Sequence, residues 1–203
     1  MFDYGNVIFM IDFLKTQQSF TNLGISNAEN FFARAGQNQL FSDFETGRIT
    51  SDQFRDGIRT LTSKPNLTDK EINDTWNSLL IGVPPINHNI LLEAKKKYRT
   101  FLLSNTNEIH LNYVHEYLER EYQINSNDSF FEKVYYSHLI GKRKPNRDIF
   151  EYVIDDSNLI PAETLFIDDS PQHLQTAHEM GFKTHLITKE DSLEKFMYSS
   201  GLI

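Results

Sequence analysis

Two patterns of apolar and polar residues divide the chain near residue 86. From residue 12 to about residue 85, apolar side chains recur at the three- and four-residue spacing of helices, and no segment indicates a convincing strand. From residue 86 onward, short apolar runs alternate with amphipathic segments, which predicts strands alternating with helices. This alternation is typical of a parallel sheet covered by helices on both faces, and therefore of an α/β fold.

The first pattern contains two helix-start signals. Thr50 is followed three residues later by Gln53, and Thr68 by Glu71, and each pair forms a capping box. Apolar residues at helical spacing follow both boxes: Phe54, Ile58 and Leu61 after the first, and Ile72, Trp76, Leu79 and Leu80 after the second. A further helix is predicted over 27–40, and the residues Gly82-Val83-Pro84-Pro85 end the last helix. We interpret this region as a helical insertion with its own aromatic core.

The second pattern predicts strands over 100–104, 133–137, 164–168 and 183–187 and helices over 90–94, 109–122, 147–154, 174–180 and 193–198. One more strand is predicted to end at Asp3, with only Met1 and Phe2 before it. Strands usually run to about five or six residues. This first strand is therefore a stub, or else the natural start lies upstream of the given sequence.

Composition narrows the function classes. The 203 residues carry a net charge of −8, which argues against a nucleic-acid partner because such a partner requires a basic face. The chain has no cysteine, so thiolate metal sites, thiol nucleophiles and disulfides are excluded. No apolar run approaches the roughly 18 residues of a membrane span, and no basic region precedes the short apolar stretch near the N-terminus. We expect a cytoplasmic protein that is not membrane-bound.

Polar residues with chemical potential follow the predicted strand ends. Asp3, Ser104 and the pair Asp168-Asp169 each end a predicted strand, and Lys144 lies in a loop shortly after a fourth strand. The C-terminal ends of parallel strands meet at one crevice, so these groups are expected to share one edge. Alone, each has a simpler interpretation: a turn aspartate, a surface lysine before proline, or a helix N-cap. Their order and placement together favour a functional site.

The expected group of side chains suits phosphate chemistry. Clustered carboxylates repel one another unless a cation lies among them, and oxygen ligands without cysteine favour Mg²⁺ over zinc. A serine hydroxyl, backbone N–H groups and a lysine ammonium are suitable partners for phosphate oxygens. An aspartate carboxylate can itself be the nucleophile and form an aspartyl-phosphate.

The chain resembles the haloacid dehalogenase (HAD) superfamily through four segments. These are FDYGNV at 2–7, LLSNTN at 102–107, GKRKP at 141–145 and FIDDS at 166–170. The likeness is greatest to the branch that has a helical cap between the first and second motifs and includes α-glucose-1-phosphate phosphatase-like members. FETGRIT at 44–50 also resembles a cap loop of this branch. The resemblance implies a Rossmannoid parallel-sheet core over 1–12 and 86–203 and a helical-bundle cap over 13–85.

The same resemblance implies a role for each matched residue. Asp3 would be the nucleophile, and Lys144 would bind the phosphate and stabilise the aspartyl-phosphate. Ser104 and Asn105 would hold the phosphate. The Mg²⁺ ligands would be Asp3, the Gly5 carbonyl and Asp169, with Asp168 close to the ion.

Two positions depart from the pattern of this superfamily. Most of its phosphatases carry a second aspartate two residues after the nucleophile as general acid and base, where this chain has Gly5. The glucose-1-phosphatase-like branch has the same glycine. Asp12 is a candidate substitute or sugar-hydroxyl ligand, and its alternative interpretation is a helix N-cap. His173 replaces the usual asparagine; it would support the metal-binding acids or face solvent.

The leading hypothesis is a Mg²⁺-dependent phosphomonoester hydrolase that acts on a small phosphorylated metabolite, for example a sugar phosphate. One alternative is a metal-independent 2-haloacid dehalogenase, which has little use for the paired acids Asp168 and Asp169. The other is a non-catalytic phosphate-binding or regulatory protein, which the glycine at position 5 and the short first strand would suit.

Overall fold

The computed structural model describes residues 1–25 and 39–203. The helix expected over 27–40 therefore lies outside the described residues except for its last two positions, which begin α3 (Gln39–Glu45). The other helices are α1 (Phe13–Asn22), α4 (Ser51–Thr62), α5 (Asp69–Asn77), α6 (Pro85–Lys97), α7 (Glu108–Tyr122), α8 (Ser137–Ile140), α9 (Arg147–Ser157), α10 (Pro171–Glu179) and α11 (Leu193–Ser199). Short 3-10 turns cover Asn127–Ser129 and Pro161–Glu163. None of the described helices is long and apolar enough to cross a membrane.

The central sheet is built around the first three residues of the chain. Strand β3 (Phe101–Ser104) pairs in parallel with β4 (Lys133–Tyr136), and β5 (Leu165–Asp168) pairs in parallel with β6 (Lys183–Leu186). Phe2 bridges both pairs, since it lies parallel to Leu102 of β3 and to Ile167 of β5. The order across the sheet is thus β4, β3, residues 1–3, β5 and β6. The expected parallel α/β sheet is confirmed, and Phe2 lies at its centre between β3 and β5.

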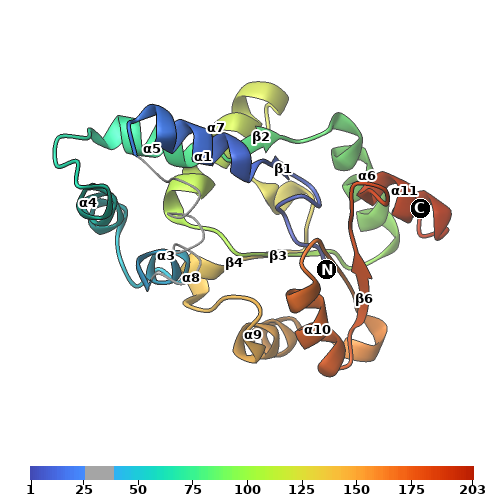
Figure 1. Ribbon diagram of the computed structural model, residues 1–203. Helices are drawn as coiled ribbons and strands as arrows, with labels where there is room; N and C mark the ends of the chain where they lie inside the picture. The colour runs from blue at the N-terminus through green and yellow to red at the C-terminus, as the bar shows by residue number, and fades with distance from the viewer. Residues whose placement is uncertain (26–38) are drawn as a thin grey trace.

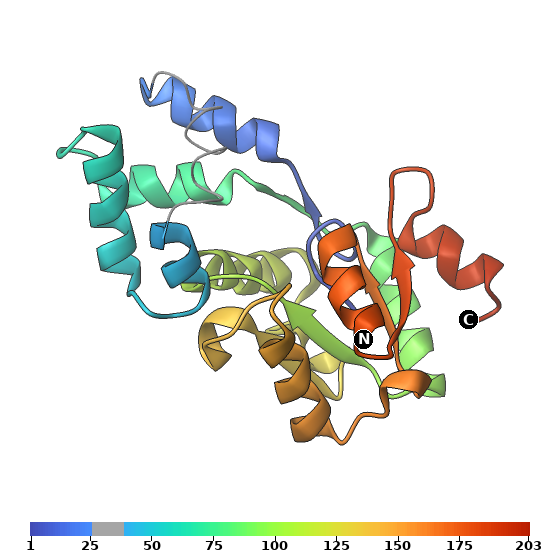
Figure 2. The same cartoon turned by 60° about the horizontal axis from the view of Figure 1, so that its bottom comes forward.

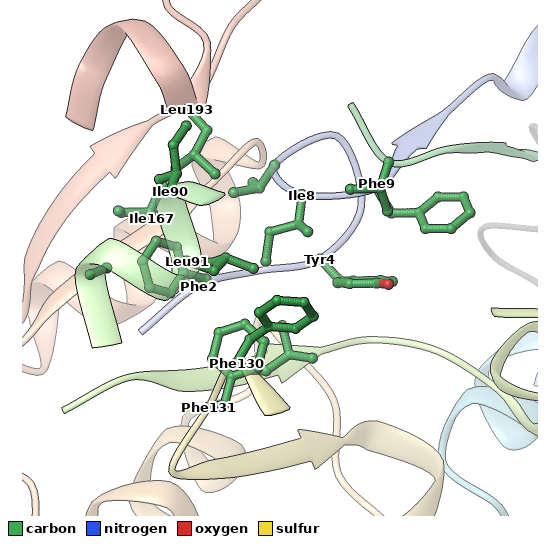
Figure 3. Packing of buried hydrophobic residues seen from close by; sticks show 14 of the residues in the cluster. Phe2, Tyr4, Ile8, Phe9, Ile90, Leu91, Phe130, Phe131, Ile167 and Leu193 are labelled. Carbon is green, nitrogen blue, oxygen red and sulfur yellow. The ribbon is translucent and has the colours of Figure 1, made fainter. Parts of the chain in front are cut away.

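Helices cover both faces of this sheet (Figures 1 and 2). On one face α6, α7 and α11 pack on Phe2, Leu102 and Ile167 in the cluster shown in Figure 3. On the other face α9 and α10 pack on Phe101, Leu103 and Phe166. Neighbouring residues of β3 point to opposite faces, as the pleat of a strand requires. Because both faces are buried, β3 has the continuous apolar sequence of a central parallel strand.

The helices α1, α3, α4 and α5 lie to one side of the sheet and share a third hydrophobic cluster (Figures 1 and 2). Phe44, Phe54 and Trp76 are in ring contact within it. Both expected capping boxes are confirmed, with Thr50 and Gln53 beginning α4 and Thr68 and Glu71 beginning α5. The proposed division into a core over 1–12 and 86–203 and a cap over 13–85 stays a prediction.

The expectation of no strand between residues 12 and 85 is wrong. Helix α5 ends at Asn77, and β2 (Leu80–Gly82) pairs antiparallel with β1 (Met10–Ile11). Leu80 matched the helical spacing of the preceding residues, but its strand is stabilised by a partner about 70 positions away, which local periodicity does not reveal. β1 comes just before the helical region and β2 comes at its end. Their pairing therefore holds the chain segments that enter and leave this region side by side.

The remaining elements lie where the alternating pattern placed them. The one shift of note is at Ser137, which was expected to end a strand and instead begins α8. Gly181 follows α10 with a φ of 92°, the left-handed conformation expected after a helix end.

Candidate active site

The buried ammonium of Lys144 is the centre of the site. Its Nζ donates hydrogen bonds to Asp3 Oδ1 at 2.6 Å, to Asp168 Oδ2 at 2.8 Å and to the Leu103 carbonyl at 2.8 Å. The Lys144 side chain has no solvent exposure. An ammonium has three protons, so all of them are satisfied by these three acceptors. The arrangement brings together residues that are 141 positions apart in the sequence.

Asn105 fixes the backbone that carries Lys144. Its Oδ1 accepts from the Lys144 backbone N–H at 2.9 Å, and its Nδ2 donates to the Lys144 carbonyl at 2.9 Å. The carboxamide expected to hold phosphate therefore holds the lysine loop in place, and phosphate contact by Asn105 stays a prediction. The preceding residue, Ser104, ends β3 as expected and is buried at the same edge of the sheet.

Three carboxylates gather beside this lysine. Asp3, Asp168 and Asp169 each offer an oxygen, and these atoms lie within 4.8 Å of one another. Asp168 also accepts from the Ser170 backbone N–H at 2.7 Å and contacts His173 Nδ1 at 3.0 Å. His173 thus lies against a buried acid. The alternative interpretation, in which it simply faces solvent, does not hold.

Asn6 is a site residue that the sequence analysis did not select. Its Nδ2 donates to Asp169 Oδ2 at 3.0 Å, and its Oδ1 accepts from the Ile11 backbone N–H at 3.2 Å. Its φ of 53° is left-handed, a conformation that asparagine tolerates better than most residues. The signal in the sequence was an asparagine directly after a glycine, a typical turn pair.

The acids differ in electrostatic environment. Burial raises the pKa of Asp3, and the nearby Asp168 raises it further, although Lys144 opposes both effects. Burial alone would raise the pKa of Asp168, but Lys144 and His173 lower it to about 2. Burial lowers the pKa of Lys144, yet Asp3 and Asp168 together raise it above its usual value. The lysine therefore stays charged, and its charge is shared between two carboxylates.

The donor set fits a magnesium ion. Three carboxylates and one ammonium leave an excess of negative charge, and only oxygen ligands are offered, which Mg²⁺ prefers. Gly5 lies beside this group, since a Cβ added to it would be 4.0 Å from Asp3 Oδ2 and 3.3 Å from Ile11 Cδ1. Ligation by Asp3, Asp169 and the Gly5 carbonyl, with Asp168 next to the ion, stays a prediction.

Asp12 has a structural role in this fold. Its Oδ1 accepts from the backbone N–H groups of Leu14 at 2.9 Å and Lys15 at 3.4 Å, so it is the N-cap of α1. This agrees with the alternative that the sequence analysis left open. A catalytic role for Asp12 stays a prediction.

A cavity of about 580 Å³ opens next to the acid cluster. Apolar and polar side chains line it in equal number, from residues 6–11, the start of α6 and the segment from the end of β6 to the start of α11, with Asp169 beside them. Asp3, Ser104 and Lys144 do not line it.

The fold and the site together define a class of protein: a parallel α/β sheet that presents three clustered aspartates and a buried lysine at one edge. The family model of the haloacid dehalogenase-like hydrolases matches residues 25–181. The chain therefore belongs to the haloacid dehalogenase-like hydrolase family.

Three relatives refine this assignment. A D-ribitol-5-phosphate phosphatase from Bacteroides thetaiotaomicron is 32% identical over 91% of this chain and 88% of its own length. A HAD family enzyme from the same organism, solved with magnesium and inorganic phosphate, is 35% identical with a TM-score of 0.84, over 92% of each chain. A predicted HAD-like family hydrolase from Porphyromonas gingivalis is 32% identical with a TM-score of 0.86, over 98% of this chain and 94% of the other.

These matches confirm the expected superfamily, the α/β fold and the class of HAD-like phosphatase. The expectation of Mg²⁺ agrees with the magnesium and phosphate bound to the relative.

Proposed function

We propose that this enzyme hydrolyses the phosphate monoester of a small hydroxylated metabolite, with Mg²⁺ as cofactor and a phosphoryl group carried transiently on Asp3. The observation that carries the proposal is the Lys144 ammonium held between Asp3 and Asp168, with Asp169 completing a cluster of carboxylates. The phosphatase activity of the ribitol-phosphate relative supports the same reaction class.

The proposed hydrolysis has two chemical steps. The Asp3 carboxylate attacks phosphorus, a bond forms between its oxygen and the phosphoryl group, and the bond from phosphorus to the leaving alcohol oxygen breaks. Lys144 stabilises the negative charge on the phosphoryl oxygens, and the Ser104 hydroxyl binds one of them. Water then attacks the phosphoryl group and releases inorganic phosphate and the Asp3 carboxylate.

Mg²⁺, when bound by Asp3, Asp169 and the Gly5 carbonyl, neutralises charge on the carboxylates and the phosphoryl group. Asn6 holds Asp169 by a hydrogen bond and so orients one of these acids. Residue 5 supplies no proton because it is glycine, so the leaving alcohol takes its proton from another group or from water.

The decisive experiment is phosphate release from a panel of polyol and sugar phosphates, with Mg²⁺ and with EDTA. We expect release only with Mg²⁺, and the Asp3→Asn variant is expected to lose about 10⁴-fold or more in kcat because the nucleophile is gone. Asp12→Asn tests the two interpretations of Asp12, since asparagine is as good an N-cap as aspartate but cannot act as a general acid.

Each outcome has a distinct meaning. An active Asp3→Asn enzyme would contradict the mechanism. A loss of activity in Asp12→Asn without a loss of stability would make Asp12 the proton donor. Chloride release from 2-chloropropionate in EDTA would favour a dehalogenase, and tight phosphate binding without turnover of any ester would favour a binding protein.

A further inference from the structure

Residues 4–9 form a tight turn, the site turn, which carries the Gly5 carbonyl and the Asn6 side chain. The Tyr4 carbonyl accepts from the Phe9 backbone N–H at 2.9 Å, and the Asn6 backbone N–H donates to the Phe9 carbonyl at 2.8 Å. A trans peptide directs its N–H and its C=O in opposite directions, so the second bond points the Gly5 carbonyl away from Phe9. The shape of the site turn therefore sets the direction of this carbonyl.

The conformation of Asn6 needs support from its surroundings. Its φ of 53° is left-handed, and such a conformation persists in a non-glycine residue when the structure around it enforces it. The side chain reaches from this position to Asp169, which accepts from Nδ2 at 3.0 Å. A site turn that relaxed would carry the donor away from Asp169.

Asn87, in the first turn of α6, is hydrogen-bonded to the site turn from the core. Its Nδ2 donates to the Ile8 carbonyl at 2.9 Å and to the Val7 carbonyl at 3.3 Å, across 79 and 80 positions of sequence. All three residues are buried. A carboxamide nitrogen has two protons, so one side chain serves both carbonyls.

Packing alone would not fix the site turn in this way. Figure 3 shows Ile8 of the site turn and Ile90 of α6 in one hydrophobic cluster, but hydrophobic contact is non-directional and leaves the direction of a carbonyl free. Two hydrogen bonds from one planar amide do fix it. Asn87 also lines the cavity of about 580 Å³ together with Asn6 and Asp169, so it lies on the side of the site turn that borders the acids.

We propose that Asn87 is a positioning residue for the Mg²⁺ site. By holding the Val7 and Ile8 carbonyls, it keeps the site turn in the conformation that places the Gly5 carbonyl and the Asn6 amide beside the acids. This inference rests on the proposed function, because it concerns the metal site of that reaction. The opposing interpretation is that Asn87 satisfies two buried carbonyls and contributes to stability alone.

The test is the dissociation constant of Mg²⁺, measured by calorimetry without substrate. Asn87→Leu keeps the size and shape of the side chain but removes both donors. We expect the Mg²⁺ dissociation constant to rise about 10-fold, since partners that orient metal ligands typically have effects of this size. If Asn87→Leu does not fold, Asn87→Ser provides the same comparison, because it leaves room for water to hydrate the two carbonyls.

Thr100→Val is the matched control. Thr100 is also buried, and its Oγ1 donates to the Phe130 carbonyl at 3.0 Å, so valine removes a comparable buried donor. Thr100 precedes β3, whereas the acids gather at the opposite end of the sheet. Thr100→Val and Asn87→Leu should both lower the melting temperature in EDTA, but only Asn87→Leu should weaken Mg²⁺ binding.

A double-mutant cycle identifies the route of the effect. Asn6→Gly tolerates the left-handed φ and removes the hydrogen bond to Asp169. If Asn87 acts through the site turn, Asn6→Gly and Asn87→Leu disturb the same group. Their combined effect on the Mg²⁺ dissociation constant should then be smaller than the product of the two single effects.

An unchanged Mg²⁺ dissociation constant in Asn87→Leu, with a lower melting temperature, would overturn the inference. Equal rises for Asn87→Leu and Thr100→Val would overturn it too, since both would then reflect general destabilisation. Multiplicative effects of Asn6→Gly and Asn87→Leu would rule out the route through the site turn. Wild-type protein that binds Mg²⁺ but releases phosphate from no ester would instead refute the proposed function and leave the role of Asn87 at the metal site intact.

Discussion

At the scale of single residues, the site depends on one buried cation. Lys144 is enclosed by two carboxylates and a carbonyl, and each of its protons has an acceptor. Neither carboxylate has a second lysine or arginine in hydrogen-bond contact among the described residues. Charge balance in this part of the core therefore depends on Lys144 and on whatever cation the acids bind.

Replacing Lys144 with methionine tests this dependence. We expect Lys144→Met to lower the free energy of unfolding by about 3–5 kcal/mol in EDTA, because it leaves Asp3 and Asp168 buried without their cation. Mg²⁺ should restore part of the loss, since it binds only the folded state of the acid cluster. Urea unfolding with EDTA and with Mg²⁺ measures both effects.

Lys142→Met is the control, because Lys142 forms an exposed pair with Asp148 and is expected to change stability by less than about 1 kcal/mol. Equal stability of the wild type and Lys144→Met in EDTA would mean that the two acids are not held as charged groups.

At the scale of elements, the loop after α3 is shaped by the close approach of Gly47 to α8. Gly47 and Gly201 share nearly the same left-handed conformation, with φ values of 66° and 70°. They differ in space: the Cβ of an alanine at 47 would overlap the His138 carbonyl, whereas nothing lies within 4 Å at 201. Alanine at position 201 would therefore introduce backbone strain alone, whereas alanine at position 47 would introduce the same strain and a steric overlap.

We expect Gly201→Ala to cost about 1 kcal/mol, the strain of a left-handed alanine. Gly47→Ala should cost clearly more, because it adds the steric overlap with the His138 carbonyl. It should also lower kcat/KM for phosphate esters, because it displaces α8 and the segment that leads to Lys144. Thermal unfolding and steady-state kinetics of both variants provide the comparison. Similar behaviour of the two variants would show that the loop moves away from α8 without consequence.

At the scale of the whole molecule, the helical region and the sheet meet at a buried histidine. His110 of α7 stacks on Trp76 of α5, with ring centroids 5.0 Å apart. Its Nε2 lies 3.2 Å from the Trp76 carbonyl, and its Nδ1 lies 3.2 Å from Asn107 Nδ2. The carbonyl needs a donor and the amide needs an acceptor, so both contacts are satisfied only by a neutral imidazole.

This contact predicts a pH dependence of stability. Burial lowers the pKa of His110 from 6.5 to about 4, with the Trp76 carbonyl opposing part of the effect. Between these values the unfolded chain binds a proton that the folded chain does not, so the stability falls as pH decreases from 6.5 to about 4. The loss approaches about 3 kcal/mol at the lower end.

Urea unfolding across this pH range measures the dependence. His110→Gln should be less stable at neutral pH but should lose less on acidification than the wild type does. His178→Gln, at an exposed position on α10, serves as the control. Parallel profiles for the wild type and His110→Gln would show that His110 does not contribute.

The sequence by itself determined most of the architecture and the identity of the central groups. Strand and helix alternation, both capping boxes and the placement of Asp3, Ser104 and Asp168 at strand ends follow from local periodicity and from the rule that parallel strands end at one edge. These features depend on neighbours in the chain, so the chain alone reveals them.

Only the tertiary structure decided which side chains meet. Four contacts join segments that are distant in the sequence. They are the pairing of β1 with β2, the hydrogen bond of Asn105 with the Lys144 backbone, the hydrogen bond from Asn6 to Asp169, and the ion pair of Glu45 with Arg143. The helical spacing around Leu80 pointed to the wrong element for the same reason. Contacts of this kind depend on how whole elements pack, and packing over tens of residues leaves no periodic trace in the sequence.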